Sequence, residues 1–257
     1  MPKIIFITGA TAGFGEACAW KFAAHGYDLI LNGRRKDRLE TLANELEQKY
    51  NVAVFQLPFD VQDQQAVATA IGSLPANWKQ VDILINNAGL ALGRDYFDEA
   101  DLNDWNTMID TNVKGFLYVA KAVAQLMVAN KTSARPGGHI INMGSIAGRE
   151  VYEKGNVYCA TKFAVDAISQ AMRIDLLRHG IKVTSINPGA AETEFSVVRF
   201  KGDETTAKKI YEGLEPLSAE DVAEVIFYCA NLPAHVCIND LSITCLQQAN
   251  TIYYNRV

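Results

Sequence analysis

A tyrosine and a lysine lie four residues apart in the stretch GNVYCATKFA, at Tyr158 and Lys162. At this spacing the two side chains share one face of a helix, one turn apart. Tyrosine is a poor base at neutral pH because its free pKa is about 10. An ammonium one turn away stabilises the phenolate and lowers that pKa, so Tyr158 is a candidate for exchanging a proton with an alcohol or a carbonyl.

Ser145 extends this candidate site, because it ends the stretch HIINMGS thirteen residues before Tyr158. A serine hydroxyl can donate a hydrogen bond to the charge that grows on a substrate oxygen. The tyrosine–lysine spacing is weak by itself, since a chain with ten tyrosines gives about half a match by chance. Without further motifs, an ordinary surface pair would be the simpler interpretation.

A glycine-rich stretch, TGATAGFG, follows the first apolar run and leads into a helical pattern. Gly9, Gly13 and Gly15 allow the backbone to turn tightly and to approach a pyrophosphate, which then binds the N-terminal amides of the helix. Their spacing is G-x-x-x-G-x-G rather than the commoner G-x-G-x-x-G. The stretch indicates a dinucleotide site, with an ordinary glycine-rich turn as the alternative.

The stretch LILNGRR, at the second apolar run, bears on which dinucleotide binds. A carboxylate is expected near its end if the cofactor is NAD, but Asn32 stands there and Arg34 and Arg35 follow. Two guanidinium groups without a neighbouring acid suit the 2′-phosphate of NADP, since arginine presents a planar fork to phosphate oxygens. The alternative is that both arginines belong to a solvated helix start, RRKDR.

These candidate residues must be positioned by short apolar runs that alternate with longer segments of helical period. Strands are predicted at residues 4–7, 28–31, 53–57, 83–85, 139–142, 182–186 and 241–245. Helices are predicted at residues 15–25, 38–50, 64–73, 103–130, 158–179 and 219–230. The pattern predicts one α/β domain over residues 1–257, with a parallel sheet covered by helices on both faces. Ligands of such sheets bind beyond the carboxyl ends of the strands, and residues 189–217 are predicted to cover that site as a lid.

Composition excludes several classes of function. The chain has 257 residues, 49% of them hydrophobic, and a formal net charge of −5, which does not favour nucleic acid as a partner. The N-terminus lacks the apolar run of a secretory signal and no run is long enough to span a bilayer, so a cytoplasmic protein without membrane contact is expected. The five cysteines are scattered and lack metal-ligand spacing, so free thiols and no metal site are expected.

The ordered set of motifs resembles the short-chain dehydrogenase/reductase superfamily over essentially the whole chain. The matching positions are TGATAGFG, Asp60-Val61, NNAG at residues 86–89, Asn112, Ser145, Tyr158, Lys162, Pro188-Gly189 and Thr193. The resemblance implies a doubly wound Rossmann-type domain of about seven strands. It implies a catalytic set of Asn112, Ser145, Tyr158 and Lys162. It also implies cofactor contacts from Thr8, Gly9, Thr11, Gly13, Phe14, Gly15, Arg34, Arg35, Asp60, Val61, Asn87, Ala88, Gly89, Tyr158, Lys162, Pro188, Gly189 and Thr193.

The resemblance assigns two further roles: Lys162 would also bind the nicotinamide ribose, and Asn112 would position a water in a proton relay. Several stretches are similar to one subgroup, the NADP-dependent 3-hydroxy acid dehydrogenases: NNAGLALG, MIDTNVKG, GNVYCATK, TEFSVVRFKGD and LPAHVCIN. That subgroup oxidises serine, allo-threonine and related acids, and relatives reduce malonic semialdehyde or sulfoacetaldehyde. The similarity implies an NADP-dependent oxidoreductase that acts between a small 3-hydroxy acid and its semialdehyde.

The anionic substrates of this subgroup imply a cationic anchor near Ser145, for which Arg94, Arg149 and Arg199 are candidates. The chain departs from the expected glycine-rich pattern at Ala190-Ala191-Glu192, which predicts a differently shaped pocket. The alternatives are a sulfoacetaldehyde reductase or another small carbonyl reductase. A non-catalytic NADP-binding sensor or scaffold is disfavoured because the glycine turn and the catalytic set are intact.

Two of the predicted helices carry apolar residues on more than one face, which a single stripe against the sheet would not use. These residues are Val113, Phe116, Leu117, Val119 and Ala120 in the first, and Phe163, Val165, Ile168 and Met172 in the second. In similar enzymes these two helices pair across a two-fold axis. A homotetramer is therefore expected, or otherwise a homodimer, with a thick core under long loops as the alternative.

Overall fold

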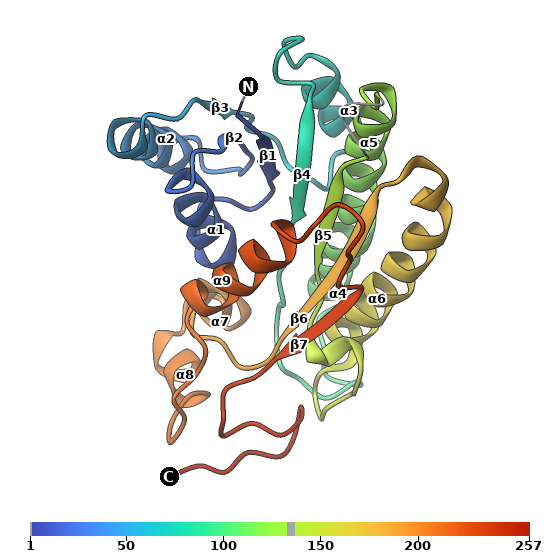
Figure 1. The fold of residues 1–257 in the computed structure, drawn as a ribbon. Helices are drawn as coiled ribbons and strands as arrows, with labels where there is room; N and C mark the ends of the chain where they lie inside the picture. Colours follow the sequence, from blue (N-terminus) through green and yellow to red (C-terminus); the bar gives the residue numbers. More distant parts are fainter. Residues whose placement is uncertain (1, 133–136) are drawn as a thin grey trace.

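Seven parallel strands form one sheet through the centre of the protein (Figure 1). The computed structural model describes residues 2–132 and 137–257. The strands are β1 (Ile4–Ile7), β2 (Asp28–Leu31), β3 (Val54–Gln56), β4 (Val81–Asn86), β5 (His139–Met143), β6 (Lys182–Pro188) and β7 (Asp240–Ile243). Their order across the sheet is β3-β2-β1-β4-β5-β6-β7.

Helices cover both faces of this sheet (Figure 1). One face packs on α1 (Gly13–Ala23), α2 (Lys36–Tyr50) and α9 (Ala219–Ala230). The other packs on α3 (Gln64–Gly72), α5 (Phe116–Ala129) and α6 (Asn156–Leu176). Side chains alternate along a strand, so Ile5 and Ile7 enter the first core while Ile4 and Phe6 enter the second. This explains why the strands are apolar throughout, and the predicted doubly wound fold is confirmed.

The segment 103–130 was predicted as one helix, and residues 102–129 are helical throughout, with one interruption of the regular α-helical pattern. It forms α4 (Leu102–Ile109), a π-helical turn at Asp110–Gly115, and α5. A π-helical turn places an extra residue in the helix and alters the direction of its side chains. Gly115 ends this turn where the helix meets Val61, and a Cβ at Gly115 would lie 2.8 Å from Val61 Cγ2. The π-helical turn therefore allows close packing at Gly115 and also changes the direction of the side chains that precede it.

The chain leaves β1 toward β2 and β3, and later crosses to β4 on the other side of β1. The carboxyl ends of β1 and β4 thus flank the point where the strand order reverses, which is where α/β sheets bind ligands. A cavity of about 350 Å³ lies here, lined by residues that follow β1, β2, β4, β5 and β6.

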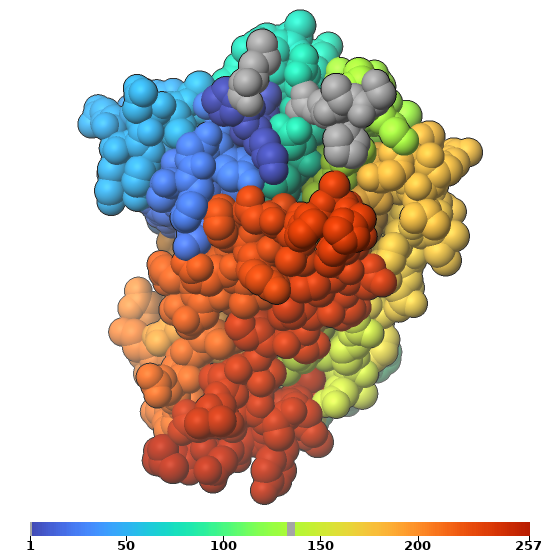
Figure 2. Space-filling model, in the orientation of Figure 1, coloured from blue at the N-terminus to red at the C-terminus, as the bar shows by residue number. Residues whose placement is uncertain are grey.

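The predicted lid, residues 189–217, contains two short helices, α7 (Glu194–Arg199) and α8 (Glu204–Lys209). Its two ends are joined, since Leu217 N donates to Ala190 O at 3.0 Å and Glu192 N donates to Leu217 O at 2.9 Å. In Figure 2 the orange residues of this segment lie below the blue N-terminal helices, with the red C-terminal residues at the bottom. Within the described ranges no helix has the length and apolarity needed to cross a membrane.

Candidate active site

The cavity brings together most of the residues predicted to bind a cofactor or to react. Those that line it are Gly9, Thr11, Gly13, Phe14, Arg34, Arg35, Asp60, Val61, Asn87, Ala88, Gly89, Ser145, Tyr158, Lys162, Pro188, Gly189 and Thr193. They come from segments as far apart as residues 9 and 193, and the parallel sheet collects them at one edge.

Two residues that were predicted to contact the cofactor, Thr8 and Gly15, instead hold the glycine turn in place. Thr8 is fully buried, and its Oγ1 accepts hydrogen bonds from the backbone N–H groups of Asn87 at 2.9 Å and Ala88 at 3.0 Å. A Cβ at Gly15 would lie 2.2 Å from Gly9 O, so only glycine allows this approach of α1 to the turn. Thr8 and Gly15 therefore do not line the cavity but fix the two loops that do.

The glycine turn itself has the geometry of an anion cradle. Gly9 and Gly13 have φ angles of +64° and +55°, in the left-handed region that glycine adopts without strain. Ala12 occupies the N-cap of α1, and among the described residues no side chain caps this helix start. The first N–H groups of α1 are thus left without a side-chain acceptor, as a pyrophosphate at a helix N-terminus requires.

At the far end of the cavity, the end of β2 presents an amide and cations instead of an acid. Asn32 is buried, and its Nδ2 donates to Leu57 O and Phe59 O, each at 3.1 Å, which uses the side chain for structure. Arg34 is 63% exposed and contacts Asp60 at 3.5 Å. Arg35 lines the cavity beside it. This arrangement fits a phosphate group better than a ribose hydroxyl.

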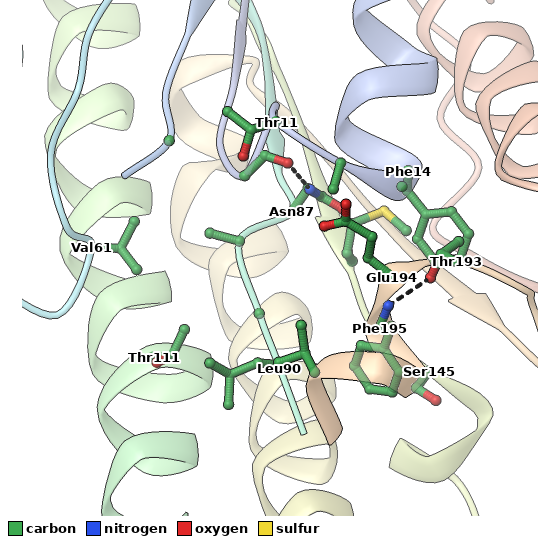
Figure 3. A pocket seen from close by; sticks show the side chains of 18 of the residues that line it. Thr11, Phe14, Val61, Asn87, Leu90, Thr111, Ser145, Thr193, Glu194 and Phe195 are labelled. Atoms are coloured by element: carbon green, nitrogen blue, oxygen red, sulfur yellow. Dashed lines mark hydrogen bonds between the residues drawn. The ribbon is translucent and has the colours of Figure 1, made fainter. Parts of the chain in front are cut away.

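Tyr158 and Ser145 both line the cavity. Figure 3 shows Ser145 near Phe195, whose ring centre is 5.7 Å from that of Tyr158. The tyrosine is 8% exposed, and burial raises its pKa above the ordinary value of 10, while a hydrogen bond with Ser145 and the charge of Arg199 act against that rise. Desolvation of the phenolate outweighs the Ser145 hydrogen bond and the Arg199 charge here. The expected lowering of the phenol pKa stays a prediction for the protein with its cofactor bound.

Lys162 lies one turn after Tyr158, as the spacing predicted, and its Nζ is 5.9 Å from the centre of the tyrosine ring. The ammonium is buried and donates to Met143 O at 2.9 Å. Burial lowers the pKa of Lys162 to about 8, so the side chain still carries its charge for most of the time at neutral pH.

Asn112 lies in the π-helical turn and does not line the cavity. Its Oδ1 accepts from Leu90 N at 2.9 Å, and its Nδ2 donates to Leu90 O at 2.7 Å and to Thr161 Oγ1 at 3.1 Å. The side chain thereby joins the loop after β4 to α6 within one turn of Tyr158. Its role toward a water stays a prediction.

The structure separates the three candidate anchors for an anion. Arg149 pairs with two carboxylates, Asp166 at 3.0 Å and Asp240, so its charge is already compensated and it is unsuited as an anchor. Arg94 is exposed and also lies outside the lining.

Arg199, the third candidate, is buried beside Tyr158 and, like the other two, is not among the residues that line the cavity. It is 8% exposed, and its guanidinium carbon lies 5.6 Å from the Tyr158 ring centre. It donates to Gly93 O at 3.2 Å and to Tyr152 Oη at 3.0 Å. Within the described part of the chain, no carboxylate forms an ion pair with Arg199. A buried cation beside the reactive phenol is thus left without an opposite charge.

Other residues of the cavity were not predicted from the sequence. They include Leu90, Thr111, Met143, Glu194, Phe195 and Val198. Figure 3 shows Glu194 pointing toward Thr11, while Phe195 packs near Ser145. For Glu194, the only signal in the sequence was its position directly after Thr193. Nothing in the sequence indicated which residues Glu194 contacts. No group of three or more His, Cys, Asp or Glu side chains suited to a metal occurs in the described residues.

A doubly wound sheet with a glycine turn at its switch point, facing a serine, a tyrosine and a buried lysine, defines a Rossmann-type oxidoreductase. The chain belongs to the short chain dehydrogenase family, which residues 3–204 match. It is 47% identical over 249 residues to sulfoacetaldehyde reductase 2 of Chromohalobacter salexigens, covering 97% of this chain and 96% of that protein.

Two further comparisons extend over nearly the whole chain. The NADP-dependent 3-hydroxy acid dehydrogenase YdfG of Salmonella typhi is 47% identical over 247 residues, or 96% of each chain. The closed form of serine dehydrogenase complexed with NADP⁺ matches the structure with a TM-score of 0.89, at 43% identity and 99% coverage of both chains.

Proposed function

We propose that this protein is an NADP-dependent oxidoreductase that interconverts a small 3-hydroxy acid and its semialdehyde. The observation that carries the proposal is the convergence of Ser145, Tyr158 and Lys162 with the glycine turn in one cavity. A reactive set alone would not indicate the chemistry, and neither would a nucleotide cradle alone. Their placement at two ends of one cavity supports a hydride-transfer enzyme.

The residues of the cavity fit a dinucleotide. The turn at Gly9 and Gly13 would hold the pyrophosphate, Asp60 and Val61 the adenine end, and Lys162 the nicotinamide ribose. Asn87 fixes the turn, since its Nδ2 donates to Thr8 O at 2.9 Å. When bound, the nicotinamide supplies or accepts the hydride.

In the reductive direction Tyr158 acts as the proton donor. Its raised pKa keeps the phenol protonated, ready to give its proton to the carbonyl oxygen as negative charge grows there. The carbonyl double bond becomes a single bond, with a new C–H bond from hydride and a new O–H bond from Tyr158. Ser145 donates to the same oxygen, and the Lys162 ammonium stabilises the phenolate that remains.

We assign the substrate anion to Arg199. A buried guanidinium, 5.6 Å from the Tyr158 ring and bonded only to neutral groups among the described residues, favours a ligand that carries negative charge. A carboxylate and a sulfonate both satisfy this requirement. Sulfoacetaldehyde is therefore the second candidate substrate, supported by the 47% identity to a sulfoacetaldehyde reductase.

We also propose that the enzyme is a cytoplasmic homotetramer whose lid, residues 189–217, covers the substrate. The groove between α5 and α6 supports the oligomer, because it is apolar and open. Leu117 lines it and is 40% exposed, and Phe163 on α6 is 41% exposed. Phe116, Val119 and Val165, by contrast, are buried in this chain and need no partner.

The experiment measures kcat/KM with NADPH and NADH for malonic semialdehyde, sulfoacetaldehyde and a neutral ketone. NADPH should be preferred by on the order of 10², since two charge-assisted contacts to the phosphate are lost with NADH. Tyr158→Phe should lower kcat at least about 10²-fold and leave NADPH binding nearly unchanged. Tyr228→Phe, at a residue 62% exposed on α9, is the control.

Arg199→Met should reduce turnover of the two anionic aldehydes far more than turnover of the neutral ketone. The neutral ketone reports on whether the variant still folds and reacts, so a general loss is distinguishable from loss of the anchor. Equal losses for all three substrates would contradict the assignment of Arg199. Retention of more than about a tenth of the activity by Tyr158→Phe would contradict the catalytic assignment.

A further inference from the structure

Glu194, the first residue of α7, links the lid to the nucleotide end of the cavity. Its carboxylate accepts from Arg35 Nη1 at 3.0 Å and from Arg38 Nη1 at 2.6 Å. Arg35 precedes α2 and Arg38 lies in its first turn, so these bonds join the lid to the segment after β2. Figure 3 shows Glu194 extending from the lid toward Thr11, on the glycine turn.

Arg35 is already bonded on all three of its nitrogens. Its Nε donates to Thr11 Oγ1 at 3.3 Å, its Nη2 donates to Thr11 O at 3.1 Å, and its Nη1 donates to Glu194. Arg34 is 63% exposed against 41% for Arg35, and among the described residues its one ion-pair contact is with Asp60 at 3.5 Å. A phosphate can therefore reach Arg34 directly, whereas full access to Arg35 requires the Glu194 carboxylate to move.

Glu194 is charged at neutral pH. Partial burial acts to raise its pKa, but the hydrogen bonds from Arg38 and Arg35 outweigh burial and hold the pKa below its usual value. Its charge is felt nearby, since the pKa of Glu16, in the first turn of α1, is raised by burial and by Glu194. An anion thus already occupies Arg35, one of the two arginines that the sequence assigned to a phosphate.

We propose that Glu194 competes with the 2′-phosphate of NADP for Arg35, and that phosphate binding releases α7 from α2. This inference rests on the proposed use of NADP. A phosphate carries more charge than a carboxylate and offers three oxygens, so it displaces Glu194 from Arg35. A nucleotide without the 2′-phosphate leaves the Glu194 contacts in place. Glu194 thereby affects both the choice of nucleotide and the freedom of the lid.

The test uses 2′,5′-ADP and 5′-AMP as probes, because they differ at the 2′-phosphate and carry no nicotinamide. Calorimetric titration compares the unchanged protein with Glu194→Gln. The variant should bind 2′,5′-ADP about three- to tenfold more tightly, because two exposed ion pairs no longer oppose the phosphate, and should bind 5′-AMP as before. Glu192→Gln is the matched control, since it makes the same charge change at an exposed lid residue two positions away.

Hydrogen exchange of the lid gives a second, activity-independent readout. Adding 2′,5′-ADP to the unchanged protein should speed exchange of backbone amides in residues 194–200, and 5′-AMP should not. Glu194→Gln should show the faster exchange without any nucleotide. Weaker binding of 2′,5′-ADP by Glu194→Gln, or an equal gain in Glu192→Gln, would overturn the proposed competition. Failure of the unchanged protein to bind either nucleotide would instead overturn the proposed cofactor.

Discussion

Tyr158 and Lys162 are both removed from water, and burial moves their pKa values away from each other. The phenol becomes a weaker acid, and the ammonium a stronger one with a pKa of about 8. Burial therefore favours the neutral form of each group before any ligand binds. In our proposal, Tyr158 becomes a phenolate when it gives up its proton during reduction, and this phenolate lies near the Lys162 ammonium. Loss of the proton and formation of the ion pair then occur in the same step.

His139, the first residue of β5, allows the effect of burial on a pKa to be tested away from the cavity. It is 3% exposed, its Nε2 lies 2.7 Å from Thr184 Oγ1, and burial lowers its pKa to about 3. The unfolded chain binds a proton there below about pH 6.5 while the folded chain does not, so stability falls as pH drops from 6.5 toward 3. The loss is about 1.4 kcal/mol for each pH unit within this window.

Urea unfolding of the unchanged protein and of His139→Asn at pH 7.5 and 5.0 measures this effect. The unchanged protein should lose about 2 kcal/mol more than the variant between the two pH values, whatever the variant costs at pH 7.5. His25→Asn, at an exposed histidine, should follow the unchanged protein. An identical pH dependence in His139→Asn would show that His139 titrates normally in the folded state.

At single residues, sequence spacing predicted the pair Tyr158 and Lys162 because both lie on one helix. It also predicted cations after β2. It did not predict that Arg38 and Glu194 meet, since 156 residues separate them and only the folded lid brings them together. Burial of Tyr158 was likewise not predicted, and this burial raises the pKa of the phenol.

Among the elements, the strands were predicted well because a strand buried on both faces is an unbroken apolar run. The helix predicted at 103–130 is present, but the π-helical turn within it was not predicted because hydrophobic period does not reveal a single inserted residue. The π-helical turn at Asp110–Gly115 depends on partners from elsewhere in the chain, Leu90 and Thr161. Asn112 is predicted here to maintain that turn through these bonds.

Asn112→Ala should lower the free energy of unfolding by about 2–4 kcal/mol, because it leaves the buried N–H and C=O groups of Leu90 without partners. Asn103→Ala, at an exposed position in α4, is the control and should change stability by less than about 0.5 kcal/mol. Urea unfolding measures both. A loss below about 1 kcal/mol for Asn112→Ala would mean that the turn is held by other contacts.

In the whole molecule, the cofactor and the substrate would both bind in one cavity at the carboxyl ends of the strands. The amino ends of the strands would have a structural role only. The outer surface of α5 and α6, which cover one face of the sheet, has a different function in our proposal. Its apolar groove has Leu117 in its lining and Ile174, 75% exposed, on α6. A groove of this kind, open between two long helices, suits the same groove on a second copy of the chain.

Light scattering at micromolar concentration should therefore give about four times the 28.2 kDa mass of the chain. Leu117→Glu should shift the mass to that of a smaller species, because each two-fold contact would bring two added charges together in an apolar groove. Thr41→Glu adds the same charge at an exposed position of α2, across the sheet from the groove, and should leave the mass unchanged. A monomeric mass for the unchanged protein would refute the tetramer. An unchanged mass for Leu117→Glu would place the contacts between copies on another face.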